Sequence, residues 1–171
     1  MGRIADLYSF VPLNKPVLFA CIGTDRSTGD SLGPLVGTFL QDKGYTVIGT
    51  LANPLHAINI PSYVEHMKTE YPDHFVVAID ACLGKVFRIG EVIVEEGSIL
   101  PGKAMNKDLP PVGDVAIKGI VNVGGFQEFT VLQNTRLNVV WEMAKEITRM
   151  CDIMMKSREF KNQSSSLLET S

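Results

Sequence analysis

Two aspartates have the positions needed for acid–base chemistry on water. Asp30 lies in the segment IGTDRSTGDSLGP (residues 22–34), and Asp80 lies in VVAIDAC (residues 76–82). Each follows an apolar run that is typical of a buried strand. If the two strands are neighbours in a parallel sheet, both carboxyl groups lie at its carboxyl edge. Such a pair can share a proton, so that one member acts as general base on water while the other protonates or polarises the scissile group.

Each aspartate also has a purely structural interpretation. Asp30 could cap the helix that follows it, which would contribute about 1 kcal/mol to stability and no chemistry. Asp80 could accept hydrogen bonds from backbone amides at the end of a strand. The expected placement of both at one sheet edge favours the catalytic interpretation, so Asp30 and Asp80 are the predicted catalytic residues.

Three more residues are expected at this edge. His56 follows the second expected strand and could orient a carboxylate, or join Asp30 and Asp80 in a divalent-metal site of oxygen and nitrogen ligands. A loop histidine bonded to backbone is the alternative. Gly124 and Gly125 close the fifth expected strand, where they would let a peptide substrate approach closely. An ordinary turn is the alternative interpretation of these glycines.

Other catalytic motifs fit the sequence poorly. The letters GDSL at 29–32 match a serine-esterase motif, but Ser31 stands nine residues beyond the expected strand end at Ile22, and no histidine follows His74. A triad of that kind needs a histidine base. The first loop lacks the glycine spacing of nucleotide-binding loops. A nucleophilic Cys82 would also need a histidine partner.

The elements that position these residues follow from the apolar pattern. Strands are expected at 17–22, 46–51, 75–79, 89–95 and 117–123, and helices at 32–40, 60–67 and 134–155. The fourth strand alternates more strongly, which indicates an antiparallel edge. Alternating strands and helices imply right-handed crossovers and a three-layer α/β/α sandwich with a mostly parallel five-stranded sheet.

Length and composition predict one domain in a reducing cytoplasm. The chain has 171 residues, a net charge of −3 and three cysteines without metal-ligand spacing. Without a basic cluster, nucleic acid and membrane surfaces are not expected partners. A single domain is expected over residues 1–156 and a disordered tail over 157–171. The broad apolar stripe of the last helix could also supply a subunit contact, which leaves a homo-oligomer open.

The two aspartate motifs resemble those of known peptidases. Residues 23–34, ending in Asp-Ser-Leu-Gly-Pro, and residues 77–81 resemble the first and second motifs of bacterial spore germination proteases. The similarity covers about residues 16–150, extends to hydrogenase maturation proteases, and is closest to short sporulation-associated proteases with this core.

This resemblance implies a phosphorylase/hydrolase-like fold and a cytoplasmic peptidase of the forespore or spore core. In germination proteases the pair matching Asp30 and Asp80 acts in an unusual aspartic mechanism on small acid-soluble spore proteins, which are the implied substrates. In hydrogenase maturation proteases the matching carboxylates contact nickel with help from a later histidine. No histidine lies within residues 110–114 here, so no cofactor is expected. A metal-assisted peptidase using His56 and a non-catalytic binding protein are the alternatives.

Overall fold

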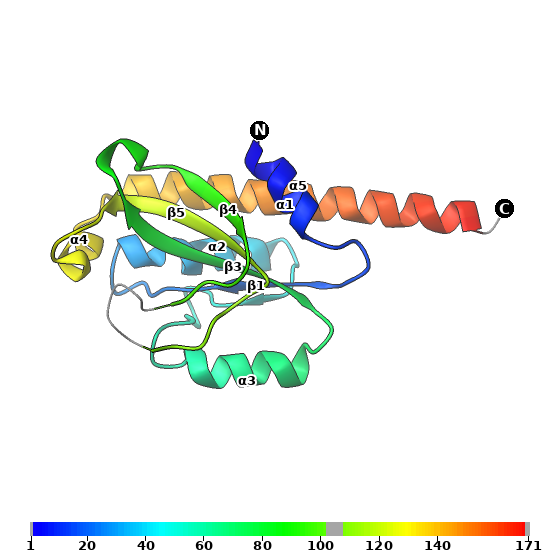
Figure 1. Cartoon of the computed structure of the whole chain (residues 1–171), viewed down its shortest axis with the longest axis horizontal. Coiled ribbons are helices and arrows are strands. Elements are labelled where there is room, and N and C mark those ends of the chain that lie inside the picture. The colour runs from blue at the N-terminus through cyan, green and yellow to red at the C-terminus, as the bar shows by residue number, and fades with distance from the viewer. Residues whose placement is uncertain (1, 102–107, 170–171) are drawn as a thin grey trace.

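The computed structural model describes residues 2–101 and 108–169, and its centre is a five-stranded sheet (Figure 1). The strands are β1 (Val17–Cys21), β2 (Val47–Ile48), β3 (Phe75–Gly84), β4 (Val92–Glu96) and β5 (Val115–Val123). Their order is β2-β1-β3-β5-β4, with β4 antiparallel to β5 and the other pairs parallel. The expected antiparallel edge strand is therefore confirmed.

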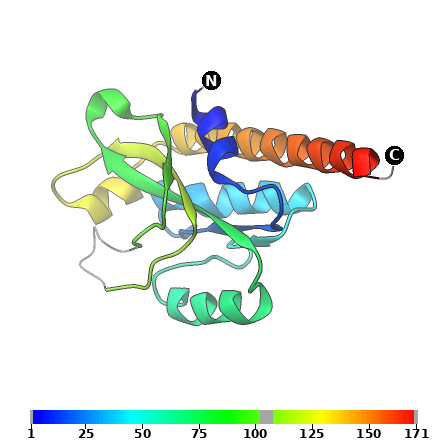
Figure 2. The same cartoon turned by 45° about the vertical axis from the view of Figure 1, so that its right-hand side comes forward.

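Helices cover both faces of this sheet (Figures 1 and 2). They are α1 (Gly2–Phe10), α2 (Leu32–Asp42), α3 (Ile60–Glu70), α4 (Glu128–Gln133) and α5 (Leu137–Glu169), with short 3-10 helices η1 (Gly29–Ser31) and η2 (Val86–Arg88). One face packs against α1, α2 and α5, and the other against α3. The expected α/β sandwich with a mostly parallel five-stranded sheet is confirmed.

Strand alternation divides the apolar side chains between two cores. In β3, Val77 and Ile79 pack toward α2 and α5, whereas Ala78 packs toward α3. In β5, Ile117 and Ala116 divide in the same way. Because successive residues of a strand face opposite sides of the sheet, this division also sets the side on which every polar residue of β3 and β5 lies.

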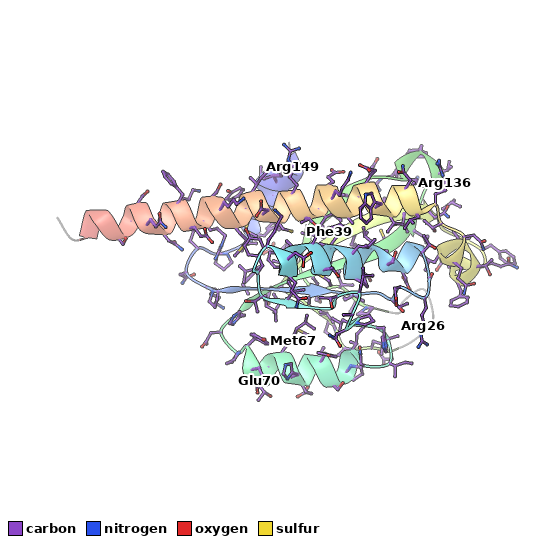
Figure 3. All side chains as sticks on the ribbon, turned by 180° about the vertical axis from the view of Figure 1, so that it is seen from behind. Arg26, Phe39, Met67, Glu70, Arg136 and Arg149 are labelled. Carbon is purple, nitrogen blue, oxygen red and sulfur yellow. The ribbon has the colours of Figure 1, made fainter. Side chains whose placement is uncertain are left out.

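Helices α2 and α5 lie side by side on their face of the sheet (Figure 3). The ring of Phe39 on α2 meets the ring of Trp141 on α5 edge-on, with 5.4 Å between centroids. Such an arrangement is favourable for aromatic pairs. The apolar stripe of α5 is thus used within the chain, and a subunit contact stays a prediction.

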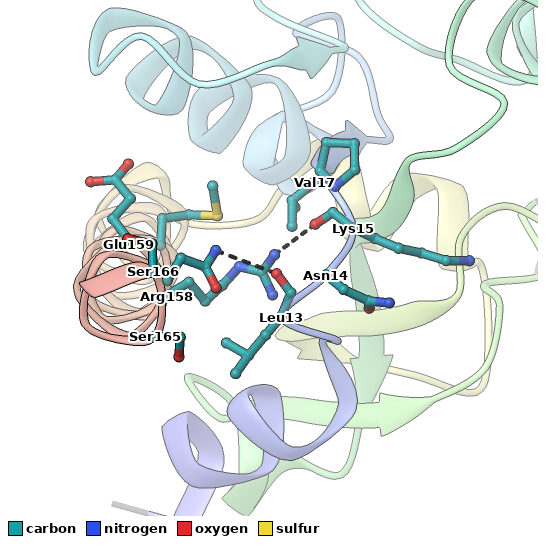
Figure 4. Close-up of a pocket in the computed structure, with 11 residues that line it drawn as sticks. Leu13, Asn14, Lys15, Val17, Arg158, Glu159, Ser165 and Ser166 are labelled. Atoms are coloured by element: carbon teal, nitrogen blue, oxygen red, sulfur yellow. Dashed lines mark hydrogen bonds between the residues drawn. The ribbon is translucent and has the colours of Figure 1, made fainter. Parts of the chain in front are cut away.

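The segment 157–171, expected to be a disordered tail, is helical as far as Glu169, where the described part of the chain ends. Arg158 accounts for the difference. Its guanidinium is buried and donates hydrogen bonds to the carbonyl oxygens of Val11, Pro12 and Lys15, the last at 2.7 Å (Figure 4). A polar composition predicts disorder because it offers little apolar surface to bury. Arg158 holds this segment through hydrogen bonds instead, which composition does not reveal.

Several other boundaries differ from the expected ones. Helix α1 was not predicted, and the unassigned segment at 126–133 contains α4. Asn134, the expected N-cap of the last helix, instead ends α4 by donating its backbone amide to Thr130. The expected loop at 100–111 lies partly outside the described residues. Within the described ranges, no helix combines the length and apolar composition that crossing a bilayer requires.

Candidate active site

A tight loop after β1 carries Asp30 to the carboxyl edge of the sheet. Gly23 has φ +143° and donates its amide to Leu55, while the amide of Thr24 bonds the carbonyl oxygen of Asp30 at 3.1 Å. A Cβ atom on Gly23 would lie 2.0 Å from that same oxygen. Only glycine fits such a conformation and approach. The loop therefore folds back on itself and fixes Asp30 beside the end of β1.

The expected alternative for Asp30, a helix N-cap, does not describe the structure. Asp30 lies inside η1, and Ser31 is the residue that precedes α2. Neither η1 nor α2 has a side-chain hydrogen bond at its N-cap. Stabilisation of the helix end therefore gives no reason for an aspartate here.

Asp80 lies within β3 rather than just beyond it, which corrects the expected strand end at residue 79. The strand continues to Gly84 because it keeps pairing with β5, where Asp80 stands opposite Lys118. By alternation with Ala78, its side chain lies on the α3 side of the sheet. Asp80 is only partly exposed, so its carboxyl group is largely removed from water.

The structure brings Asp30 and Asp80 together electrostatically. Burial, and then the negative charge of Asp30, hold the pKa of Asp80 well above its usual range. A hydrogen bond from the Ala81 backbone and the positive charge of Lys118 act in the opposite direction. Burial also raises the pKa of Asp30. Neighbouring carboxyl groups that resist ionisation in this way can share one proton.

His56 directly follows Leu55, which forms an isolated parallel β-bridge with Ile22. The ring of His56 lies close to Ile58 and Asn59 of its own loop. The backbone amide of Ile58 lies 3.3 Å from Nδ1, and the Asn59 amide nitrogen lies 3.5 Å from Nε2. The loop-histidine interpretation describes this environment. In the part of the chain that the structure describes, no three His, Cys, Asp or Glu side chains are placed to hold a metal ion. The alternative ligand set of Asp30, Asp80 and His56 is therefore not assembled.

Gly124 and Gly125 lie at the carboxyl end of β5, as expected. The amide of Gly124 donates to Gly84 at 2.9 Å, which ties the ends of β5 and β3 together. Gly125 has φ +130°, a conformation that a turn demands and that glycine allows. A Cβ atom on Gly125 would meet nothing within 4 Å, so the turn conformation accounts for this glycine and the space beside it is open.

Sequence reasoning missed Lys118 and Glu95, which lie on the same side of the sheet as Asp80. Lys118 Nζ is 2.6 Å from Glu95 Oε2. The available signal was a single lysine inside the otherwise apolar run VAIKGIV at 115–121. Cys82 shares this surface, and burial and then the charge of Asp80 raise the pKa of its thiol to about 11. It stays protonated at neutral pH, which argues against a thiolate nucleophile.

The fold as a whole is that of the hydrogenase maturation proteases. The NiFe hydrogenase maturation protease HycI from Thermococcus kodakarensis KOD1 is similar with a TM-score of 0.61 and 21% identity, over 88% of this chain and 98% of that chain. For HybD, a second maturation protease from Thermococcus kodakarensis, the TM-score is 0.52 and the identity 14%, over 81% of this chain and 98% of that one. At these identities the similarity shows the fold alone.

The chain belongs to the family described as "Protein of unknown function (DUF1256)", whose model matches residues 4–150. A curated relative, the "Uncharacterized protein YyaC" of Bacillus subtilis (strain 168), is 52% identical over 133 residues, or 76% of this chain. The match spans 65% of that relative's length. Neither description mentions sporulation, germination or a reaction, so the expected role in spores stays a prediction.

Proposed function

We propose that this protein is a peptidase in which Asp30 and Asp80 share one proton and activate water. The observation that supports the proposal is the parallel pairing of β1 and β3, which brings the loop of Asp30 and the end of β3 with Asp80 to the carboxyl edge of the sheet, where the pKa of both carboxyl groups is raised. Ligand and catalytic sites of open α/β folds lie at this edge. The fold, shared with proteins named as maturation proteases, supports the same reaction class by analogy.

The two roles are assigned within the pair as part of this proposal. Burial and the neighbouring Asp30 favour the protonated form of Asp80, so Asp80 is assigned the shared proton and Asp30 the role of general base. Asp30 accepts a proton from water as the water oxygen attacks the scissile carbonyl carbon, and Asp80 donates its proton to the carbonyl oxygen. When the tetrahedral intermediate breaks down, Asp30 passes its proton to the leaving amine and Asp80 recovers a proton from the hydroxyl group.

Exposed apolar side chains at the same edge favour a polypeptide substrate. They come from two segments that begin at the tied ends of β3 and β5: Val86, Phe87, Val123, Phe126 and Phe129. Large apolar side chains exposed on both of these segments favour a binding role for them. We infer that they hold apolar side chains of an extended segment beside the carboxyl pair.

The physiological substrate is proposed from the resemblance of residues 23–34 and 77–81 to germination-protease motifs. Small acid-soluble spore proteins are the first substrates to test, and the cytoplasm of the forespore or spore core is the proposed location. No metal step is included, because His56 is held by Asn59 and Ile58 rather than by the carboxyl pair.

The decisive experiment measures cleavage of spore proteins and of a mixed peptide library by mass spectrometry, with and without a chelator. Asp30→Asn and Asp80→Asn should each lower the rate by about 10²- to 10⁴-fold, since each removes a proton-transfer group. Asp25→Asn is the matched control, because Asp25 is exposed on the same loop. Cleavage that survives both substitutions would refute the aspartate pair, and sensitivity to the chelator would favour a metal-assisted reaction.

The substrate surface has its own test. Phe126→Ser should raise KM several-fold and leave kcat unchanged, since it removes apolar contact area away from the reacting atoms. Phe160→Ser is the control, because Phe160 is also largely exposed but lies far along α5. Equal effects of the two variants would remove the apolar segments from the binding site.

A further inference from the structure

Three neighbouring strands place charged residues on one side of the sheet. Asp80 of β3 stands opposite Lys118 of β5 in the parallel register. On the other side of β5, Lys118 stands opposite Ile93 of β4, and Glu95 is two residues further along β4. Alternation with Ala78 and Ala116, which pack toward α3, puts the side chains of Asp80 and Lys118 on this same side. Across the three strands a carboxyl group, an ammonium group and a carboxylate therefore follow one another.

Lys118 has little structural justification at this position. β5 is an interior strand, parallel to β3 and antiparallel to β4, and lysine is among the residues least often buried in such strands. Its ion pair with Glu95 is 2.6 Å long, but the side chains keep 32% and 51% of their exposure. An ion pair this accessible to water contributes between zero and about 1 kcal/mol to stability. Stability therefore gives a weak reason for a lysine in β5.

The charge of Lys118 acts on Asp80. Its charge lowers the pKa of Asp80, whereas burial is the cause that raises the pKa of Asp30. The groups that face Asp80 are Asp30 from η1, Cys82 on its own strand and Lys118 from β5. Lys118 is the one cation among them and the direct neighbour of Asp80 across the strands.

We propose that Lys118, held in place by Glu95, is a positioning residue for the Asp30–Asp80 pair, and that its charge determines how readily Asp80 gives up the shared proton. When Asp80 transfers that proton to the carbonyl oxygen of the substrate, it becomes a carboxylate opposite Lys118 across the β3–β5 pair. Lys118 keeps its own protons throughout and stabilises the charge that develops on Asp80. The catalytic role of Lys118 rests on the proposed function, whereas its effect on the proton affinity of Asp80 does not.

The test uses two substitutions with opposite expected signs. Lys118→Met removes the cation, so the titration midpoint of Asp80 should move to higher pH by on the order of one pH unit. Glu95→Gln keeps an oxygen acceptor for Lys118 but removes the competing negative charge, so the midpoint should move to lower pH. The measurement is an NMR titration of aspartate side-chain carboxyl carbons in the full chain, with Asp80→Asn used to assign the signal.

Two further variants distinguish an effect of the Lys118 charge from a general disturbance of the structure. Lys118→Arg keeps the charge and should leave the midpoint near its original value. Lys68→Met removes a lysine that pairs with Glu65 at 2.7 Å on α3, and should not shift the midpoint. Shifts of the same sign in Lys118→Met and Glu95→Gln, or no shift in either, would overturn the proposal.

The outcome is independent of whether peptidase activity is found. Opposite shifts of the Asp80 midpoint without any cleavage would uphold the role of Lys118 and count against the proposed function alone. Where cleavage is measurable, Lys118→Met should move the limb of the pH–kcat profile that reports Asp80 in the same direction as the NMR midpoint.

Discussion

Buried charge is handled differently at the two ends of β1. At the amino end, the guanidinium of Arg158 is buried and donates hydrogen bonds to the carbonyl oxygens of Val11, Pro12 and Lys15. The bond to Lys15 is drawn in Figure 4. At the carboxyl end, Asp30 and Asp80 are removed from water next to a like charge, and the pKa of each is raised. The charge of Arg158 has hydrogen-bond partners, whereas the carboxyl groups of Asp30 and Asp80 repel each other when both are ionised.

This difference separates structural from functional burial. A buried cation that is solvated by backbone carbonyls stabilises the segments it joins, here the chain before β1 and the far part of α5. A carboxyl pair that is desolvated and mutually repulsive costs stability, and such groups concentrate at functional sites. The amino end therefore holds the molecule together, and the carboxyl end is where chemistry is expected.

The largest stability effect is expected at the amino end. Arg158→Met should lower the free energy of unfolding by about 2 to 3 kcal/mol, because three carbonyl oxygens lose a charged donor while the apolar stem is kept. For a chain of this size the melting temperature should fall by roughly 5 to 10 °C. Thermal denaturation followed by circular dichroism measures the change.

Arg149→Met is the control for this substitution. Arg149 is exposed on the same helix (Figure 3) and should change stability by less than about 0.5 kcal/mol. If the two variants had the same melting temperature, Arg158 would not be the anchor of α5, and the contrast between the two ends of β1 would disappear.

The opposite sign is expected at the carboxyl end. The folded state holds the Asp80 proton to higher pH than the unfolded chain does, so stability is lost as the pH rises from the unfolded pKa of Asp, about 4, through the raised folded pKa. Asp80→Asn removes this loss and should stabilise the protein at neutral pH by on the order of 1 kcal/mol. The gain should vanish below about pH 4, where the carboxyl is protonated in both states.

Urea denaturation of both proteins between pH 3 and 8 measures this difference. The control is Asp25→Asn, since Asp25 is exposed on the same loop as Asp30 and its replacement should leave the pH profile unchanged. A destabilised Asp80→Asn protein at neutral pH would mean that the carboxylate is satisfied after all, as Arg158 is.

The carboxyl end was more predictable from sequence than the amino end. The apolar runs before Asp30 and Asp80 mark buried parallel strands, and parallel strands bring their carboxyl ends to one edge. The carboxyl pair follows from topology, without knowledge of side-chain contacts. Lys118 was missed because a lone lysine in a strand is normally a solvent-facing residue, and only the register with β3 shows what it faces.

At the amino end, helix α1 has only a short sequence pattern, and the contacts of Arg158 have none. Helix α1 contributes Leu7 to the core, and Ile4, Tyr8 and nearby Val11 pack with it at helical spacing, a pattern typical of an amphipathic helix that was overlooked because it is short. The helical continuation past residue 156 depends on Arg158 reaching carbonyl oxygens near residue 12. Contacts that link such distant parts of a chain through a polar side chain leave no periodicity to detect.

The smallest expected effect tests the same contrast within the Asp30 loop. Ser27 is buried and, among the described residues, its hydroxyl has no hydrogen-bond partner, whereas the hydroxyl of nearby Ser31 donates to the Thr28 carbonyl at 2.6 Å. Ser31→Ala should cost about 1 kcal/mol because it removes one of the two hydrogen bonds that the Thr28 carbonyl accepts from Ser31, and Ser27→Ala should be neutral or stabilising by up to about 1 kcal/mol. Denaturation of the two variants in parallel measures the difference. A larger loss for Ser27→Ala would reveal a bonded Ser27 hydroxyl, and the loop around Asp30 would then be as fully satisfied as the Arg158 anchor.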